Sequence, residues 1–307
     1  MTRRRTLAGA LLITAVSGVL VWALGHPDVS LGTTAVRAVA VVAAVVTLGL
    51  SVVPLLDTGR HRRELHASAG APMIVGSAVW LVAELARAMF NSASAAGTTV
   101  WSVGWRTSYD YLVLTAPGRA ALLTMACAGL VLGLAVLGAH TAPAGVATVG
   151  AAAAGIVGHS LTGHLAHHPV GSVAVAAHAL AAALWCGALA ALVLTVEHRG
   201  RWSRVLPRFS QMSLWCVIVL LAGGILAGSA QLSSAGELFS TGYGRILVAK
   251  SLCTALLLAL AWRHRTVWVP AARGHRSTAE LSLRRAHLEL AVMCVALTAA
   301  AALAVTG

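Results

Sequence analysis

The chain has 307 residues, of which 58% are hydrophobic and only 10% are charged. This composition excludes an ordinary soluble domain, since the apolar residues form runs of about 20, the length that crosses a bilayer as a helix. The formal net charge of +13 would suit a nucleic-acid partner if it formed one soluble basic surface. The basic residues lie instead between the apolar runs, so we expect contact with membrane lipids and not with nucleic acid.

Nine apolar runs predict an all-α, polytopic membrane helix bundle, because backbone groups in lipid must be satisfied within each helix. The runs lie near residues 7–25, 34–56, 71–90, 118–139, 144–166, 171–195, 210–232, 244–262 and 286–305. The first run follows Arg3-Arg4-Arg5, so a signal peptide is the alternative interpretation. The length of this run and the lack of an A-x-A site favour a retained helix.

Most basic residues cluster before the first run and after the second, sixth and eighth runs. With nine spans these segments share one side, which the positive-inside rule makes cytoplasmic. The N-terminus is therefore predicted to be cytoplasmic and the C-terminus extracytoplasmic. We expect two regions: residues 1–140, with four helices and a long outer loop at 91–117, and residues 141–307, with five helices.

Polar residues inside the runs indicate a functional site, since ionisable groups in hydrocarbon are costly unless paired, ligated or facing a polar cavity. His159 and His178 each lie roughly 10 Å from the outer end of neighbouring predicted helices. Two imidazoles at matching depth can share one metal ion or one cofactor. His164, His167 and His168 lie nearer the surface and form either an outer entrance for the metal or a solvated loop.

Three further residues are predicted to lie at a similar depth in the outer half of the membrane and would support the site: Glu84, Lys250 and Met125. Each has a simpler explanation. Glu84 is spaced to pair with Arg87 on its own helix, Lys250 could extend to the outer surface, and Met125 could be a packing residue. The five cysteines include no C-x-x-C pair and are interpreted as packing residues. The histidines in or beside basic segments are interpreted as solvated: His61, His66, His198, His264, His275 and His287.

The second half of the chain contains several short motifs in a distinctive order. They are Gly158-His159, the stretch from His178 to Leu189, Arg208-Phe209-Ser210, the stretch from Thr241 to Lys250, and the stretch from Leu283 to Leu290. In this order the chain resembles the copper resistance D family of bacterial membrane proteins over roughly residues 150–305. The resemblance implies a protein of the cytoplasmic (inner) membrane that moves copper toward the cytoplasm, with a separate periplasmic copper chaperone as a possible partner.

Three functions remain open at this point. The leading hypothesis is a copper-binding permease or copper-tolerance protein that captures Cu+ or Cu2+ at the outer histidines and passes it to His159 and His178. The first alternative is a redox subunit in which these two histidines ligate a b-type haem. The second alternative is a metal-free assembly or scaffold protein. We expect no enzymatic activity, because the sequence contains no G-x-S-x-G, H-E-x-x-H or P-loop pattern.

Overall fold

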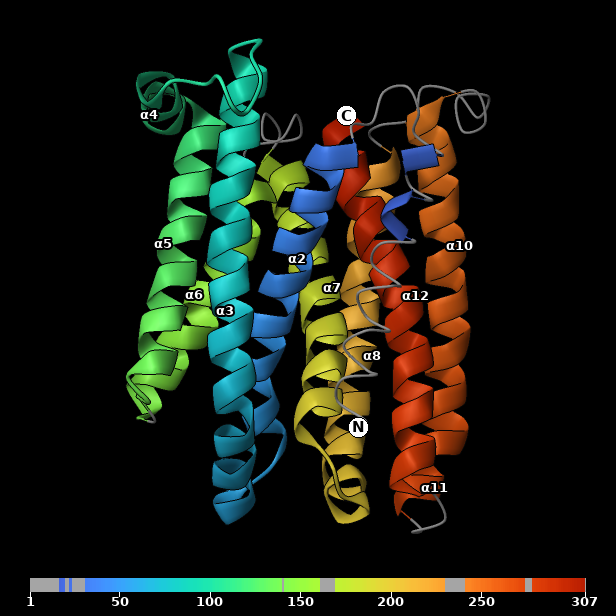
Figure 1. Ribbon diagram of the computed structural model, residues 1–307. Helices are drawn as coiled ribbons and strands as arrows, with labels where there is room; N and C mark the ends of the chain where they lie inside the picture. The colour runs from blue at the N-terminus through green and yellow to red at the C-terminus, as the bar shows by residue number, and fades with distance from the viewer. Residues whose placement is uncertain are drawn as a thin grey trace.

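The computed structural model describes residues 17–19, 22–23, 31–139, 141–160, 169–229, 241–273 and 278–306. These residues form a bundle of long helices and contain no strand (Figure 1), so the predicted all-α membrane bundle is confirmed. Seven described helices are long and apolar enough to cross a membrane, and an eighth apolar helix is shorter. Most of the first predicted run, 7–25, lies outside the described residues. The count of nine spans and the side of each terminus therefore stay predictions.

The other eight predicted runs each correspond to a helix. These are α2 (Leu31–Val52), α3 (Gly59–Ala95), α5 (Ala116–Val136), α6 (Ala142–Ser160), α7 (Pro169–Thr195), α8 (Arg199–Ser229), α10 (Gly242–Arg263) and α12 (Ala279–Thr306). Short helical segments follow α2 and α10, namely η1 (Val53–Leu56), η3 (His264–Trp268) and α11 (Val269–Arg273). The helices α3 and α8 begin well before their predicted runs. The first two turns of each helix are mostly polar but include a buried apolar residue, Leu65 in α3 and Trp202 in α8, which a count of consecutive apolar residues does not detect.

The connection predicted as a long outer loop at 91–117 is partly helical. The helix α3 continues to Ala95, and a short helix, α4 (Trp105–Leu114), packs against α3 and α5. The first turn of α5 lies against the end of α4, since a Cβ on Gly118 would collide with the carbonyl oxygen of Tyr111. The helix α4 has only 10 residues, so a search for membrane-length runs could not find it.

The basic connections gather at one end of the bundle, the lower end in Figure 1. Arg208 donates from Nη1 to the carbonyl oxygen of Leu56 at 3.0 Å, and Arg204 Nε lies 3.3 Å from a carboxylate oxygen of Asp57. These contacts tie the start of α8 to the turn between α2 and α3, and α11 packs on α8 nearby. Following the positive-inside rule, we call this the inner end of the bundle and the opposite end, where α4 lies, the outer end.

The helices α2 and α7 cross with their backbones in direct contact. A Cβ on Gly49 would overlap the backbone of Gly187, and a Cβ on Gly187 would overlap the carbonyl group of Val45. Only glycine permits this approach. The helix α2 also packs against α3, α6 and α12. Helices from the two predicted regions, 1–140 and 141–307, therefore enclose a common interior, while the division itself stays a prediction.

Candidate functional site

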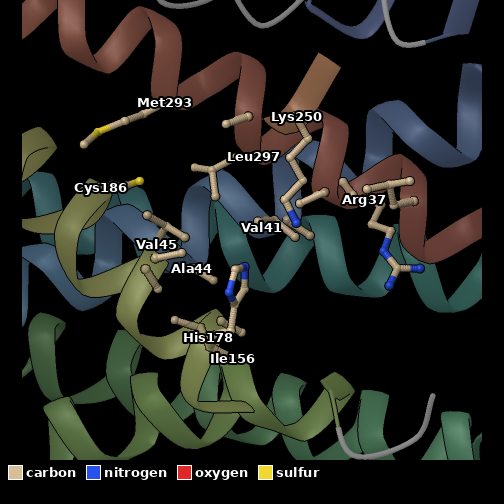
Figure 2. A pocket seen from close by; sticks show the side chains of 18 of the residues that line it. Arg37, Val41, Ala44, Val45, Ile156, His178, Cys186, Lys250, Met293 and Leu297 are labelled. Atoms are coloured by element: carbon tan, nitrogen blue, oxygen red, sulfur yellow. The ribbon is translucent and has the colours of Figure 1, made fainter. Parts of the chain in front are cut away.

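A cavity of about 430 Å³ lies between α2, α3, α7, α10 and α12, with contributions from α6 and α8. This volume falls within the range of small-molecule binding sites. Apolar side chains form most of its wall, but five charged or imidazole-bearing residues also line it: Arg37, Glu84, Arg87, His178 and Lys250. Figure 2 shows Lys250 and His178 directed toward each other from two helices, with Arg37 apart from them on a third helix.

The cavity lies in the outer half of the bundle. Arg37 follows the first residue of α2 by six positions. His178 follows the first residue of α7 by nine positions, and Lys250 follows the first residue of α10 by eight. At about 1.5 Å per residue, these positions are roughly 9–14 Å from the outer ends of their helices. The sequence-based expectation that His178 and Lys250 lie at one depth therefore agrees with the helix boundaries.

A backbone contact fixes the protonation pattern of the His178 ring. Its Nδ1 lies 2.8 Å from the carbonyl oxygen of Leu220 on α8. A carbonyl oxygen only accepts, so Nδ1 carries the proton and donates. In the neutral ring the other nitrogen, Nε2, then has a free lone pair. His178 can offer this nitrogen to a metal ion or to a hydrogen-bond donor in the cavity.

Two consecutive glycines on α8 make room for the His178 ring. A Cβ on Gly223 would lie 2.9 Å from the Ala174 carbonyl oxygen and 3.0 Å from the His178 Cβ. A Cβ on Gly224 would lie 3.3 Å from the His178 Cε1. The absence of these side chains allows α7 and α8 to approach closely enough for the bond from His178 to Leu220.

Glu84 forms a buried ion pair with Arg87, as the simpler explanation of the sequence pattern anticipated. The Arg87 Nη2 and a Glu84 carboxylate oxygen are 2.9 Å apart, and both side chains are almost fully buried. The pair forms part of the wall on α3. Lys250 is directed into the cavity (Figure 2) and does not extend to the outer surface. Met125 is half-buried on α5 and does not line the cavity.

Arg37, Cys186 and Met293 also line the cavity, and the sequence does not predict them as site residues. Arg37 lies in the second apolar run, where a lone arginine is an unusual residue that could have been noticed. Cys186 is buried on α7 and Met293 on α12, and Figure 2 shows both on one side of the cavity. Thiol and thioether groups bind Cu+, so these two residues extend the chemistry of the cavity beyond nitrogen.

The remaining predicted histidines fall at or beyond the limits of the described chain. His159 lies in the last turn of α6, one helical turn beyond Gly155 and Ile156, which line the cavity. Its backbone is therefore on the helix face that borders the cavity. His164, His167 and His168 lie outside the described residues. Within the described part of the chain, no group of three or more His, Cys, Asp or Glu side chains is close enough to hold a metal ion.

Comparison with known proteins identifies the C-terminal third of the chain. The model of the family described as copper resistance protein D matches residues 203–303, which include α10 and nearly all of α8 and α12. The match thus contains Lys250 and Met293 but not His178 or the α2 and α3 residues. The resemblance inferred from the sequence is confirmed for this region.

A relative with a related description is the copper transport protein CutJ of Bacillus subtilis. It is 36% identical over 94 residues, which are 28% of this chain and 17% of CutJ. The chain therefore matches a small part of that relative's length. No solved structure matches the chain. Together, these findings show a chain with seven helices long and apolar enough to cross a membrane, whose C-terminal third is similar to copper resistance protein D.

Proposed function

We propose that this chain binds copper in the outer-half cavity and moves it across the cytoplasmic membrane toward the cytoplasm. The observation that carries the proposal is His178: the Leu220 carbonyl fixes its tautomer and leaves the Nε2 lone pair as a ligand in a membrane-embedded cavity. The copper resistance protein D match on α8, α10 and α12, which supply part of the cavity wall, supports copper as the metal.

Imidazole nitrogen binds either Cu+ or Cu2+, whereas thiol and thioether sulfur favour Cu+. Cys186 follows His178 by two helical turns on α7 and lies deeper in the bundle. In our proposal copper is captured at His164, His167 and His168, held by His178 together with His159, and passed inward past Cys186 and Met293. An extracytoplasmic copper chaperone would deliver the metal to the outer end.

The membrane potential can supply the driving force for this movement. A cation that moves to a negative cytoplasm gains about 2.3 kcal/mol per charge per 100 mV. We propose a passive, non-enzymatic permease, because the sequence contains no nucleotide-binding P-loop pattern. The only chemistry required is exchange of copper ligands along the path.

Metal analysis of purified protein tests the proposal. The wild type should retain copper after gel filtration, and His178→Ala should lose most of it. His198→Ala is the matched control, since His198 is an exposed histidine at the inner end. Equal copper in all three proteins would contradict the assignment. An absorption spectrum of the same samples would show a Soret band if His159 and His178 bind haem instead.

A further inference from the structure

Lys250 and His178 face each other across the outer-half cavity, Lys250 from α10 and His178 from α7 (Figure 2). The Lys250 charge acts electrostatically on the His178 ring, so the two groups are neighbours. Because the His178 Nδ1 donates to the Leu220 carbonyl, Nε2 is the ring atom with a free lone pair. An amine and an imidazole nitrogen therefore meet in the interior of the bundle.

The Lys250 amine has no other partner among the described residues. No carboxylate or hydroxyl in this part of the chain forms an ion pair or a hydrogen bond with its Nζ. Thr254, one turn further along α10, donates to the Lys250 backbone carbonyl oxygen at 2.9 Å and not to the side chain. Burial without a counter-charge makes the loss of a proton from an ammonium less costly, and the neutral amine has a lone pair.

We infer that Lys250 Nζ is a copper ligand that faces His178 Nε2, so that Cu+ is held between an amine and an imidazole nitrogen. This inference rests on the proposed function and names the ligand pair and the oxidation state. Cu+ accepts a pair of ligands in a line, whereas Zn2+ takes a tetrahedral set and Ca2+ a larger set of oxygens. A facing pair therefore suits Cu+, and His159 can add a further nitrogen.

The binding step exchanges a proton for the metal. An ammonium has no lone pair, so Lys250 must lose one proton before it can bind Cu+. The N–H bond breaks, the proton leaves to the aqueous phase, and the nitrogen lone pair forms the bond to Cu+, with no transfer of electrons. One positive charge leaves as one arrives. A bare cation would add charge to a largely apolar space, which is unfavourable.

Acid should oppose this step, because protons compete with the metal for both nitrogens. The other titratable or charged groups that line the cavity are Arg37 on α2, Glu84 and Arg87 on α3, Cys186 on α7 and Tyr243 on α10. Lys250 can be observed separately from all of these, because it is the only lysine in the chain. Labelling with nitrogen-15 lysine therefore gives a single Nζ signal.

Silver coupling in the NMR spectrum tests the bond directly. Ag+ has the charge and the linear coordination of Cu+, and silver-109 has a magnetic nucleus. In protein labelled with nitrogen-15 lysine and nitrogen-15 histidine, Ag+ should split the Lys250 Nζ signal and the His178 Nε2 signal. His178→Ala should remove the splitting at Lys250 at the same silver concentration. A Lys250 signal that is identical in metal-free and silver-loaded protein would overturn the inference.

Two substitutions distinguish a ligand from a positive charge. Lys250→Met removes both the charge and the lone pair, whereas Lys250→Arg keeps a charge but offers no lone pair. Loss of groups that only orient metal ligands lowers affinity by about 10–100-fold, so both variants should lose at least about tenfold in Cu+ affinity. Tyr243→Phe, on the same helix and the same cavity wall, should bind Cu+ as the wild type does. Unchanged or higher affinity in Lys250→Arg would contradict a role as ligand.

The same measurements separate this inference from the proposed function. Silver coupling at His178 without coupling at Lys250 would refute the amine ligand and leave metal binding by His178 intact. Metal held by both nitrogens, in protein that moves no copper into vesicles, would retain the site and refute transport. Wild-type protein that retains neither Ag+ nor Cu+ would refute both.

Discussion

Two partly buried histidines, His178 in the outer half and His264 near the inner end, have different environments. His264 Nδ1 lies 2.6 Å from a carboxylate oxygen of Glu289, and both side chains are largely buried. The His264 ring also meets Trp268 edge-on, with 4.7 Å between ring centroids. Trp268 in turn donates from Nε1 to the Ser282 hydroxyl at 3.1 Å. This inner cluster connects η3 to α12 through contacts between side chains.

The void beside the inner cluster is about 20 Å³, compared with about 430 Å³ in the outer half. The smaller space has room for about one water molecule. The inner histidine has a carboxylate partner, whereas His178 contacts a backbone carbonyl and retains an available nitrogen. Trp185 lines both spaces. A partly buried histidine therefore does not by itself indicate a binding site. His178 differs from His264 in its available ring nitrogen and in the larger cavity beside it.

The largest effect is expected at the inner cluster. Glu289→Ala leaves the largely buried His264 Nδ1 without its carboxylate partner, and a buried polar group left unsatisfied costs about 1–3 kcal/mol. Thermal unfolding in detergent should therefore show a strongly destabilised protein. Glu280→Ala, at an exposed position in the first turn of α12, should unfold close to the wild type. If both variants unfold at the same temperature, the inner cluster is not a structural contact.

A second prediction concerns the glycine beside His178. Gly224→Ala places a Cβ 3.3 Å from the His178 Cε1 and should displace the ring from the Leu220 carbonyl. Changes to groups that orient metal ligands lower affinity by about 10–100-fold, so we expect copper affinity to fall by about tenfold. A competition titration with a Cu+ chelator measures this change.

The matched control for this substitution is Gly129→Ala on α5, where an added Cβ meets nothing within 4 Å. This variant should bind copper as the wild type does and should be at least as stable, because alanine favours a helix more than glycine does. Equal copper affinity in Gly224→Ala and Gly129→Ala would show that the position of the His178 ring does not control metal binding.

The sequence predicted the helices well because hydrocarbon thickness sets their length and lipid excludes unpaired backbone groups. The sequence also singled out His178 and Lys250, since ionisable residues stand out within apolar runs. Both line the cavity, while their role in a site stays a prediction. The sequence alone could not decide whether Glu84 pairs with Arg87 or belongs to a site, because the answer depends on whether the Arg87 side chain turns toward Glu84. The structure shows that it does.

For other residues the prediction from sequence is wrong or incomplete, because their neighbours come from distant parts of the chain. His264 was interpreted as solvated from the arginines around it, and this was wrong: η3 turns it toward Glu289 on α12. Cys186 was interpreted as a packing residue; it is buried, and it also lines the cavity. Arg37 lies near the start of an apolar run and lines the cavity, although the sequence does not predict it as a site residue. A cavity is formed by several helices together, so no single run reveals its lining.

The smallest effect is expected from an exposed pair near the inner end. The Arg204 Nε is 3.3 Å from a carboxylate oxygen of Asp57, but the Arg204 side chain is 37% exposed. Solvent screens such a pair, so Arg204→Gln should cost about 1 kcal/mol or less. A thermal unfolding measurement alongside Glu289→Ala should give the smaller shift, and added salt should reduce the shift for Arg204→Gln further. If Arg204→Gln lowers the unfolding temperature more than Glu289→Ala does, the Arg204–Asp57 ion pair stabilises the inner end more than the His264 cluster does.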